Sequence, residues 1–215
     1  MFSIEHLGTK DAHVWKSFVK REGLSEDQER QFATYLGLLL EWNQKINLTR
    51  ITDFSSIVAY HFQDSLRVSD FVDFNSVSGA ADVGSGAGFP GIPLCIKFPQ
   101  LHMTLLEVCS KKAAFLELVI KELGLSHCTV TTLDWRTFLR QTDHNIDVFL
   151  SRASLQPEEL VRMFKPSSPY KHGKMIYFAS KRCQAAAEEK AFLVATKEYT
   201  VGDQQRVYAF FSLMA

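Results

Sequence analysis

A glycine-rich stretch, ADVGSGAGFPGIPL at residues 81–94, is the part of the chain with the clearest chemical meaning. It holds four glycines and two prolines, and most of them follow directly after Asp82. Glycine allows a sharp turn, and it also lets a ligand approach the backbone closely. A single tight turn needs fewer glycines than this. We therefore expect the loop to hold a ligand, with a ligand-free turn as the alternative.

The residues around this loop indicate the kind of ligand. The loop contains the dinucleotide fingerprint GxGxxG, but the Asp82 carboxylate would repel a pyrophosphate. An acid followed by Gly84, Gly86 and Gly88 better suits a ligand with a cationic amine and no phosphate, such as S-adenosylmethionine. Glu107 follows the next predicted strand, where an acid can bind ribose hydroxyls; the alternative is a solvated acid. No Gly-Lys-Ser/Thr follows, so a phosphate-cradling P-loop is excluded.

The composition is that of a globular chain with a sizeable core. The 215 residues are 46% hydrophobic, include 17 Phe, and carry a formal net charge of zero. Four cysteines are widely spaced without a CxxC pair, so we expect reduced thiols and no metal site. No apolar run approaches the roughly 18 residues of a membrane helix. A signal-peptide pattern is also missing, and we expect a cytoplasmic protein with no membrane contact.

The elements that must position the loop fall into two parts. In the first part, Ser25 and Gln28 form a capping-box pattern before a helical run, and a second helix is predicted near Asp53. That second helix places four residues on one stripe: Ile57, His61, Asp64 and Val68. We predict an N-terminal helical extension over residues 1–75 and a second domain over residues 76–215.

From residue 79 the pattern alternates between strands and helices. Alternation of this kind predicts an α/β fold with a parallel sheet and helices on both faces. We expect Ser110 to cap one helix and Gly124 to close it, and a polar helix from Gln184 to Thr196. The closing strand follows a short connection and could pair antiparallel. The predicted strands are 79–83, 102–108, 128–133, 146–153, 173–180, 198–201 and 206–214.

Several motifs occur together in one order: EWNQKINLTRI, HFQDSL, the glycine loop, TLLEVCSKKAAFLELVIKELGL and SRA. This set resembles the RsmG or GidB family, which methylates N7 of a guanine in 16S ribosomal RNA. The resemblance implies a Rossmann-like class I methyltransferase sheet of seven strands with an N-terminal helical extension. It also implies S-adenosyl-L-methionine as cofactor and the 30S ribosomal subunit as partner.

The resemblance also assigns roles to residues. It places Gly84 and Phe89 against the cofactor and Glu107 on the ribose. The family's adenine-contacting turn, usually Gly-Arg-Ala/Val-Glu, aligns here with Leu133, Asp134, Trp135 and Arg136. This is a departure, in which Trp135 could stack on adenine. The family's Lys-Gly after the fifth strand is also changed here, to Lys181-Arg182.

Arg152 matches the family's arginine after the fourth strand and could orient the nucleotide or the cofactor carboxylate. The alternative is an ion-paired surface arginine. Asn47, His61 and Asp64 match the family motifs and could wall the nucleotide pocket. His61 and Asp64 lie at i and i+3, so they could also bond each other in a packing cluster. The positive charge available for RNA comes from Lys20, Arg21, Lys45, Arg50, Arg67, Lys111, Lys112, Lys165, Lys171, Lys174, Lys181 and Arg182.

The expected chemistry is simple. Guanine N7 already carries a lone pair, so methyl transfer needs alignment rather than a base, a nucleophile or a metal. Asp64 or the backbone carbonyls after Ser151 could stabilise the charge that develops on the base. Three alternatives stay open: a methyltransferase fold with another substrate, a non-enzymatic RNA-binding factor, and an oxidoreductase. A monomer is favoured, and the target nucleotide and the form of the RNA substrate stay open.

Overall fold

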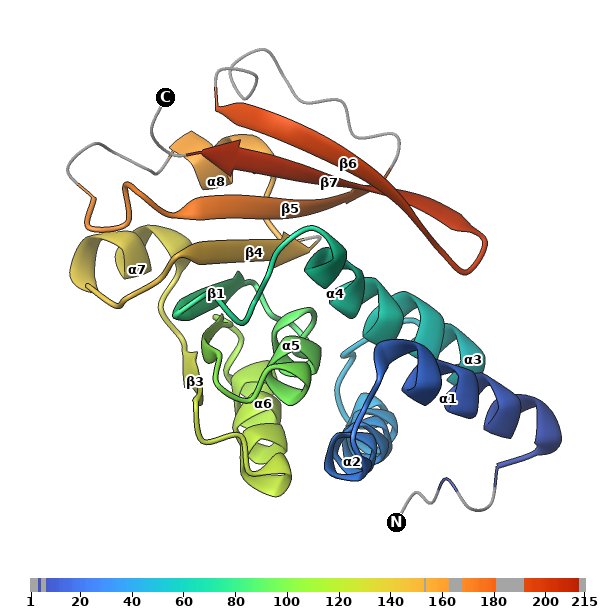
Figure 1. The fold of residues 1–215 in the computed structure, drawn as a ribbon. Helices are drawn as coiled ribbons and strands as arrows, with labels where there is room; N and C mark the ends of the chain where they lie inside the picture. The colour runs from blue at the N-terminus through green and yellow to red at the C-terminus, as the bar shows by residue number, and fades with distance from the viewer. Residues whose placement is uncertain (1–3, 5–6, 153, 163–167, 181–191, 213–215) are drawn as a thin grey trace.

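A computed structural model describes residues 4, 7–152, 154–162, 168–180 and 192–212. Its centre is a seven-stranded sheet with the strand order β3-β2-β1-β4-β5-β7-β6 (Figure 1). The first five strands are parallel, and β7 is antiparallel to both of its neighbours. The strands are β1 Gly79–Val83, β2 His102–Leu106, β3 Cys128–Thr131, β4 Val148–Arg152, β5 Lys174–Ser180, β6 Leu193–Val201 and β7 Gln204–Ser212. The sheet and its antiparallel closing strand confirm the predicted fold class.

The strand order reverses direction beside β1. The chain moves outward from β1 to β2 and β3, and then returns to the other side of β1 with β4. All five residues of β1 are buried, as expected for a parallel strand covered on both faces. Ligands of open α/β sheets bind at the carboxyl ends of the strands near such a reversal. The glycine loop leaves β1 at this point.

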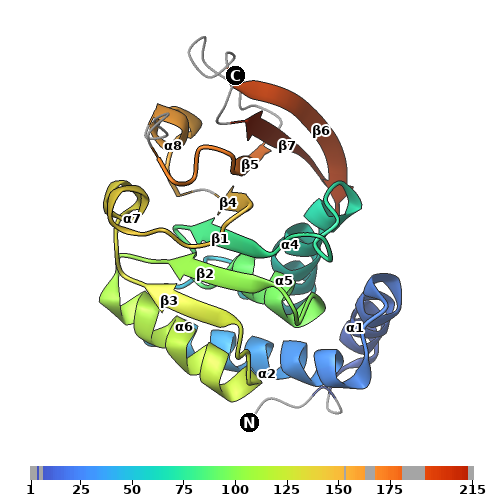
Figure 2. The same cartoon turned by 60° about the vertical axis from the view of Figure 1, so that its left-hand side comes forward.

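Helices cover both faces of the sheet, as Figure 2 shows. One face carries α5 (Gly91–Lys97), α6 (Ser110–Leu123) and the N-terminal helices, which share one large hydrophobic cluster. The other face carries α7 (Trp135–Gln141) and α8 (Pro157–Arg162), which pack in a second, smaller cluster. The predicted class of sheet covered on both faces is therefore present, and Ala87 and Phe89 of the glycine loop belong to the larger cluster.

The N-terminal helices begin as the sequence indicates. In α2 (Glu26–Asn43), the Ser25 hydroxyl accepts from Gln28 N–H and the Gln28 side chain accepts from Ser25 N–H, which confirms the capping box. Helix α1 spans Thr9–Glu22 and ends at Gly23 in the left-handed region, with φ of 57°. Gly124 ends α6 in the same way, with φ of 65°. Both glycines adopt a conformation that side chains disfavour.

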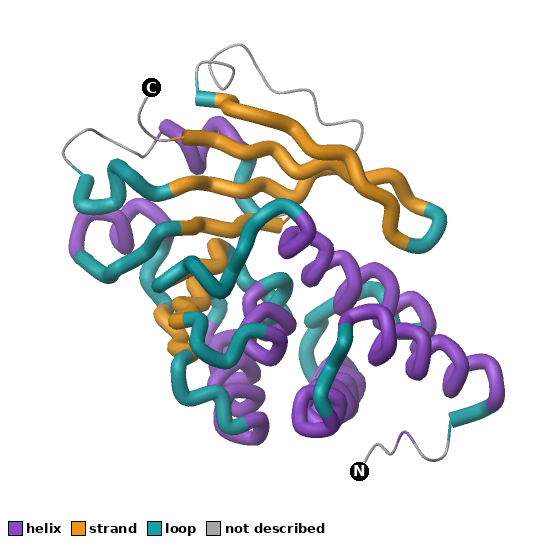
Figure 3. The backbone as a smooth tube through the Cα atoms, in the orientation of Figure 1, coloured by secondary structure: helices purple, strands orange, loops and turns teal. Residues whose placement is uncertain are grey.

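A continuous helical segment follows from Asp53, which caps α3 (Phe54–Ile57) by accepting from Ser56 N–H. It continues as the π-helix η2 (Val58–Gln63), α4 (Asp64–Leu66) and the 3₁₀-helix η3 (Arg67–Asp70), which Figure 3 shows as one rod. The predicted stripe of Ile57, His61, Asp64 and Val68 is buried, as expected. π-Helical turns are rare and occur often at functional sites.

Two local predictions are wrong. Ser110 is the first residue of α6 rather than its cap; Cys109 holds the cap position without a side-chain hydrogen bond. Residues 193–196, expected at the end of a polar helix, belong to strand β6, while residues 184–191 lie outside the described part of the chain. Strand β6 is an edge strand with many exposed positions, so pairing with β7 rather than local sequence decides its conformation.

The division near residue 75 stays a prediction. Aromatic residues of the N-terminal part, Phe18, Phe32 and Phe62, contact one another and belong to the same cluster as Phe89 of the glycine loop. Tyr35 contacts both Phe62 and Phe89 at ring-centroid distances of 5.6 and 5.4 Å. None of the helices that the structure describes is long and apolar enough to cross a membrane.

Candidate active site

A cavity of about 1000 Å³ opens at the carboxyl ends of the parallel strands. Its wall includes the loops after β1, β2, β3 and β4, together with η2 and residues of β5, β6 and β7. Its volume is in the range of small-molecule sites. The cavity therefore lies where the reversal of strand order predicts a ligand.

The glycine loop forms one wall of the cavity. Gly84 and Gly86 both line it, with φ of +73° and +60°. A Cβ atom on Gly84 would lie 2.2 Å from Cβ of Ser154, so the loop and the segment after β4 approach closely only because residue 84 is glycine. Backbone N–H groups of Gly84 and Ser85 donate to Leu106 O (2.9 and 3.0 Å), which fixes the loop against β2.

Glu107 stands at the opposite side of the loop, at the end of β2. Its Oε2 accepts from Gly86 N–H at 2.8 Å, and its Oε1 accepts from Cys109 N–H at 2.9 Å. The side chain is buried and lines the cavity. Each carboxylate oxygen has a second lone pair free for an O–H donor. These acceptor oxygens suit the two hydroxyls of a ribose, and the ribose role of Glu107 stays a prediction.

Asp82 and Gly88 are not placed as expected. The Asp82 carboxyl group is fully buried outside the cavity lining, where Oδ2 accepts from Gly91 N–H at 2.9 Å and Oδ1 has no hydrogen-bond partner. Burial raises the pKa of Asp82 to about 7. A Cβ on Gly88 would lie 2.9 Å from the Tyr35 hydroxyl, because this glycine faces the core. Both residues support the loop from behind rather than facing a ligand.

A cluster of two rings and one arginine forms the wall of the cavity next to the loop. The Phe89 ring stacks on the His61 ring, with centroids 4.5 Å apart and planes 17° apart. The Arg152 guanidinium lies 5.0 Å from the centre of the same Phe89 ring, which is a cation–π arrangement. All three residues line the cavity. The sequence predicted them separately, and the structure brings them together.

Arg152 also contacts both His61 and Asp64, the two residues that could bond each other according to the sequence. Its Nη1 donates to Asp64 Oδ2 at 3.1 Å and to Tyr60 O at 3.2 Å, and its Nη2 lies 3.4 Å from His61 Nδ1. No hydrogen bond joins His61 directly to Asp64 among the described contacts, so that expectation is corrected. The second Asp64 oxygen accepts from the Tyr199 hydroxyl at 2.7 Å. Asp64 is therefore a positioning group for Arg152.

His61 is neutral near pH 7. Burial, with smaller contributions from Arg152 and Arg206, lowers its pKa to about 3. The arginine donates, so Nδ1 must accept, and the ring proton belongs on Nε2. Nε2 lies 2.7 Å from Thr49 Oγ1, which accepts it. Thr49 also accepts from Ile51 N–H at 3.1 Å, so its own hydroxyl proton is left for another acceptor in the cavity that it lines.

Asn47 does not reach this site. Its side chain is exposed, and it is not among the residues that line the cavity. The structural asparagine of the motif is Asn43, whose side-chain oxygen accepts from Leu48 N–H and Thr49 N–H, both at 2.9 Å. Asn43 thus stabilises the turn that places Thr49 next to His61. The expectation for Asn47 as a catalytic residue is corrected.

The residues after β3 that differ from the family's adenine-contacting turn have local structural roles. Asp134 caps α7 by accepting from Thr137 N–H at 2.9 Å. Trp135 lines the cavity but is only 4% exposed, and its Nε1 donates to Leu160 O at 3.2 Å. The indole is thus held against α8, and its stacking on adenine stays a prediction. Arg136 is exposed at the cavity wall, where it can reach a ligand.

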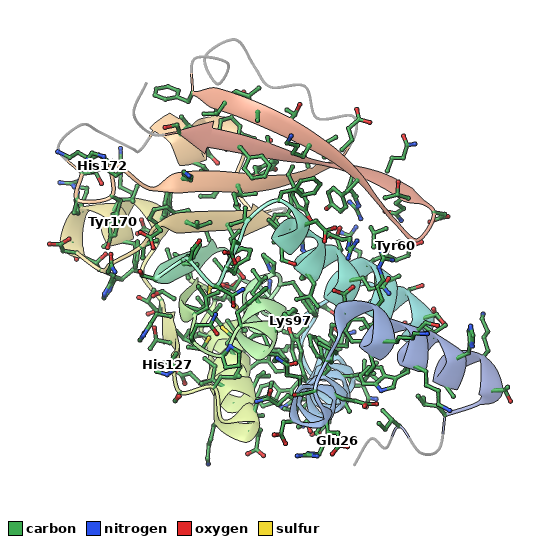
Figure 4. The ribbon with its side chains drawn as sticks, viewed as in Figure 1. Glu26, Tyr60, Lys97, His127, Tyr170 and His172 are labelled. Atoms are coloured by element: carbon green, nitrogen blue, oxygen red, sulfur yellow. The ribbon has the colours of Figure 1, made fainter. Side chains whose placement is uncertain are left out.

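The basic residues proposed for RNA separate into groups. Lys112 lines the cavity, whereas Arg67 is held in ion pairs with Glu22 and Asp70. Lys174 lines a different cavity of about 790 Å³. Figure 4 shows two other residues of that cavity, Tyr170 and His172, far from Tyr60 at the opposite end of the sheet. Lys165, Lys181 and Arg182 lie outside the described residues.

Several polar residues of the cavity were not predicted from the sequence, among them Thr49, Tyr60, Ser154, Tyr199 and Arg206. Thr49 lies within a motif that was recognised, so the motif itself carried a signal for it. Tyr199 and Arg206 are on the β6–β7 hairpin, whose first strand was predicted to begin only at residue 198. These two residues reach the site because of the strand order, and no local sequence pattern predicts that contact.

Comparison with known proteins gives a consistent picture. The family model described as rRNA small subunit methyltransferase G matches residues 28–207. A protein named ribosomal RNA small subunit methyltransferase G from Bacillus velezensis is 36% identical over 190 residues, which cover 87% of this chain and 77% of that protein. A protein of the same name from Staphylococcus aureus is 37% identical over 173 residues, covering 80% and 72%.

Solved structures support the fold. A mutant of MtNAS in complex with S-adenosylmethionine matches with a TM-score of 0.56 and 14% identity, over 92% of this chain and 83% of that chain. The mitomycin 7-O-methyltransferase MmcR matches with a TM-score of 0.54 and 17% identity, over 93% and 67%. At sequence identities of 14% and 17%, these matches show a similar fold and nothing more.

Proposed function

The chain belongs to the rRNA small subunit methyltransferase G family, and from this membership we propose that it transfers a methyl group from S-adenosylmethionine to N7 of a guanine in 16S ribosomal RNA. The observation that carries the proposal is one cavity in which a glycine loop and Glu107 face a cluster built on Arg152. A cofactor end and a substrate end therefore lie side by side in a chain that matches this family over most of its length.

The cofactor end fits S-adenosylmethionine. Glu107 would accept from the ribose hydroxyls, and the open backbone at Gly84 and Gly86 would lie against the donor. Phe89 and the exposed Arg136 complete this part of the wall. When bound, S-adenosylmethionine supplies a methyl group on a cationic sulfonium. No Gly-Lys-Ser/Thr follows the loop, in keeping with a donor that has no phosphate.

At the substrate end, Arg152 would orient the guanine. Nη1 of Arg152 is used by Asp64 and Tyr60, and Nη2 lies against His61, which leaves further N–H donors for the base. Guanine O6 accepts such donors, while N7 must stay free to attack the methyl group. The neutral His61 cannot protonate N7, since its pKa is about 3. The site thus aligns a nucleophile that is already reactive.

The ribosomal RNA would reach this site across the rim of the cavity. Lys112 and Arg136 line the wall, and so does Val108, at 65% exposure. Positive charge at such a rim attracts the phosphate backbone. We also propose that the protein acts as a monomer in the cytoplasm, where ribosomal subunits are found.

Labelled-methyl transfer tests this proposal. Purified protein is incubated with radiolabelled S-adenosylmethionine and 30S subunits from a strain that lacks the corresponding gene, followed by nucleoside mass spectrometry. We expect label in 16S RNA and the appearance of 7-methylguanosine. Subunits from the parent strain, in which the position is already modified, are the control and should accept almost no label. A different methylated nucleoside, or no label in the 30S subunits from either strain, contradicts the proposal.

A further inference from the structure

Arg206 is a cationic side chain of the cavity wall that the mechanism above does not use. It lies on β7, near the start of the strand, and its backbone pairs with Tyr199 of β6 and Ser180 of β5. Among the described residues, its Nε is buried and has no hydrogen-bond partner. No carboxylate oxygen of the described residues lies within 4.0 Å of its side-chain nitrogens, so it forms no ion pair there. A buried guanidinium donor without a partner costs free energy.

The position of Arg206 separates it from the cofactor end. In the strand order β1-β4-β5-β7, Arg206 stands three strand intervals from the glycine loop of β1. Neighbouring strands are about 4.8 Å apart, which places β7 roughly 14 Å across the sheet from β1. Glu107 on β2 is one interval further away. Arg152 on β4 lies between the two ends. Arg206 therefore borders the part of the cavity that receives the substrate.

Arg206 makes no ion pair with the acids of this end among the described residues. Arg152 is neutralised by Asp64, whose other oxygen is occupied by Tyr199. Asp203, at the tip of the hairpin, accepts a hydrogen bond from the Tyr60 hydroxyl rather than from Arg206. His61 is neutral, and Arg206 itself contributes to that by lowering the pKa of His61. A ligand with anionic acceptor oxygens would satisfy the unpartnered Nε–H of Arg206 in the cavity wall.

The hairpin that carries Arg206 is fixed in place on the helical segment below it. Figure 4 shows Tyr60 of η2 beside the tip of the β6–β7 hairpin. Gly202 at the tip has φ of +57°, and a Cβ there would lie 2.9 Å from the Tyr60 ring. The Tyr199 ring also stacks on Tyr208 at 4.1 Å, and the Tyr208 hydroxyl donates to Asp64 O at 3.1 Å. The backbone that carries Arg206 is thus fixed at the cavity.

We propose that Arg206 forms a phosphate subsite that holds the backbone of the RNA beside the target guanine. Nε and a terminal nitrogen of an arginine match two oxygens of one phosphate in a bidentate contact. The cofactor carboxylate is the other anion available, but the donor's loop lies across the sheet from Arg206. This inference rests on the proposed function, since it assigns a further contact to the same RNA substrate.

Arg206→Gln tests the subsite, because glutamine keeps a polar side chain and removes the charge. We expect the apparent KM for unmodified 30S subunits to rise about tenfold, with the Kd for S-adenosylmethionine within twofold of wild type. The slope of log affinity against log salt should fall by about one, the signature of one lost phosphate contact. The melting temperature should stay equal or rise, since an unpaired buried donor is removed.

Arg140→Gln is the matched control, because Arg140 is an exposed arginine of α7 outside the cavity lining. It should leave the KM, the salt slope and the cofactor Kd unchanged. If wild type transfers no methyl group, the proposed function fails, whatever Arg206 does. If wild type is active and Arg206→Gln keeps the wild-type KM and salt slope, the phosphate subsite is wrong. If only the Kd for S-adenosylmethionine rises, the phosphate subsite is also wrong, and Arg206 contacts the cofactor carboxylate instead.

Discussion

Gly84→Ala should weaken the binding of S-adenosylmethionine by at least about 100-fold, measured by titration calorimetry. The added Cβ would lie 2.2 Å from Cβ of Ser154, and φ of +73° is a conformation that alanine rarely adopts. The loop must move to relieve both problems. Movement would take its backbone away from Leu106 O and displace Gly86 from Glu107. The ribose site and the loop would then no longer be aligned.

Two further variants separate this effect from general strain. Gly124→Ala also places alanine at a positive φ, +65°, but nothing lies within 4 Å of the new Cβ. It should lower the free energy of unfolding by about 1 kcal/mol and leave cofactor binding unchanged. Adding Ser154→Gly to Gly84→Ala removes the collision and should recover part of the affinity. Wild-type affinity in Gly84→Ala would contradict the role assigned to the loop.

Asp64→Asn should lower kcat for methyl transfer to 30S subunits by about 100-fold, with cofactor affinity within threefold of wild type. The neutral amide no longer balances Arg152, whose Nη1 lies 3.1 Å from Asp64 Oδ2. The guanidinium would lose its fixed orientation on Phe89 and would no longer present its donors to the guanine. The free energy of unfolding should fall by about 2 kcal/mol, because a buried hydrogen bond to a charged group is lost.

Asp70→Asn is the control for this second variant. It weakens another arginine–carboxylate pair, Arg67–Asp70 at 2.9 Å, on η3 and away from the cavity lining. Its activity should equal that of wild type, and its stability should change little, since Asp70 is 45% exposed. Asp64→Asn with wild-type kcat would show that Asp64 only stabilises the fold.

The sheet and the cofactor loop were predictable because their signals are local. Parallel strands buried on both faces appear as short apolar runs, and β1 and β4 are of this kind. The capping box of α2 depends on two residues three positions apart, and a closing glycine on the end of the helical run before it. The same holds for the stripe that carries His61 and Asp64, because helical spacing alone places both on the buried face.

Orientation and long-range pairing were not predictable in this way. The sequence places Asp82 beside the loop, but only the packing of α5 turns its carboxyl group toward Gly91 N–H and away from the cavity. Asn43 and Asn47 belong to one motif, and the turn geometry selects Asn43. Tyr199 reaches Asp64 across 135 residues of sequence, through a hairpin that ends the sheet. No short-range pattern contains that contact.

A crystal structure with S-adenosylhomocysteine, the product of the cofactor, tests the central claim most directly. We predict its ribose hydroxyls on the Glu107 carboxylate, its chain along Gly84 and Gly86, and its sulfur facing the side of the cavity that holds Phe89 and Arg152. Density for the ligand elsewhere, or a nucleoside diphosphate binding in the same loop in its place, would contradict the account.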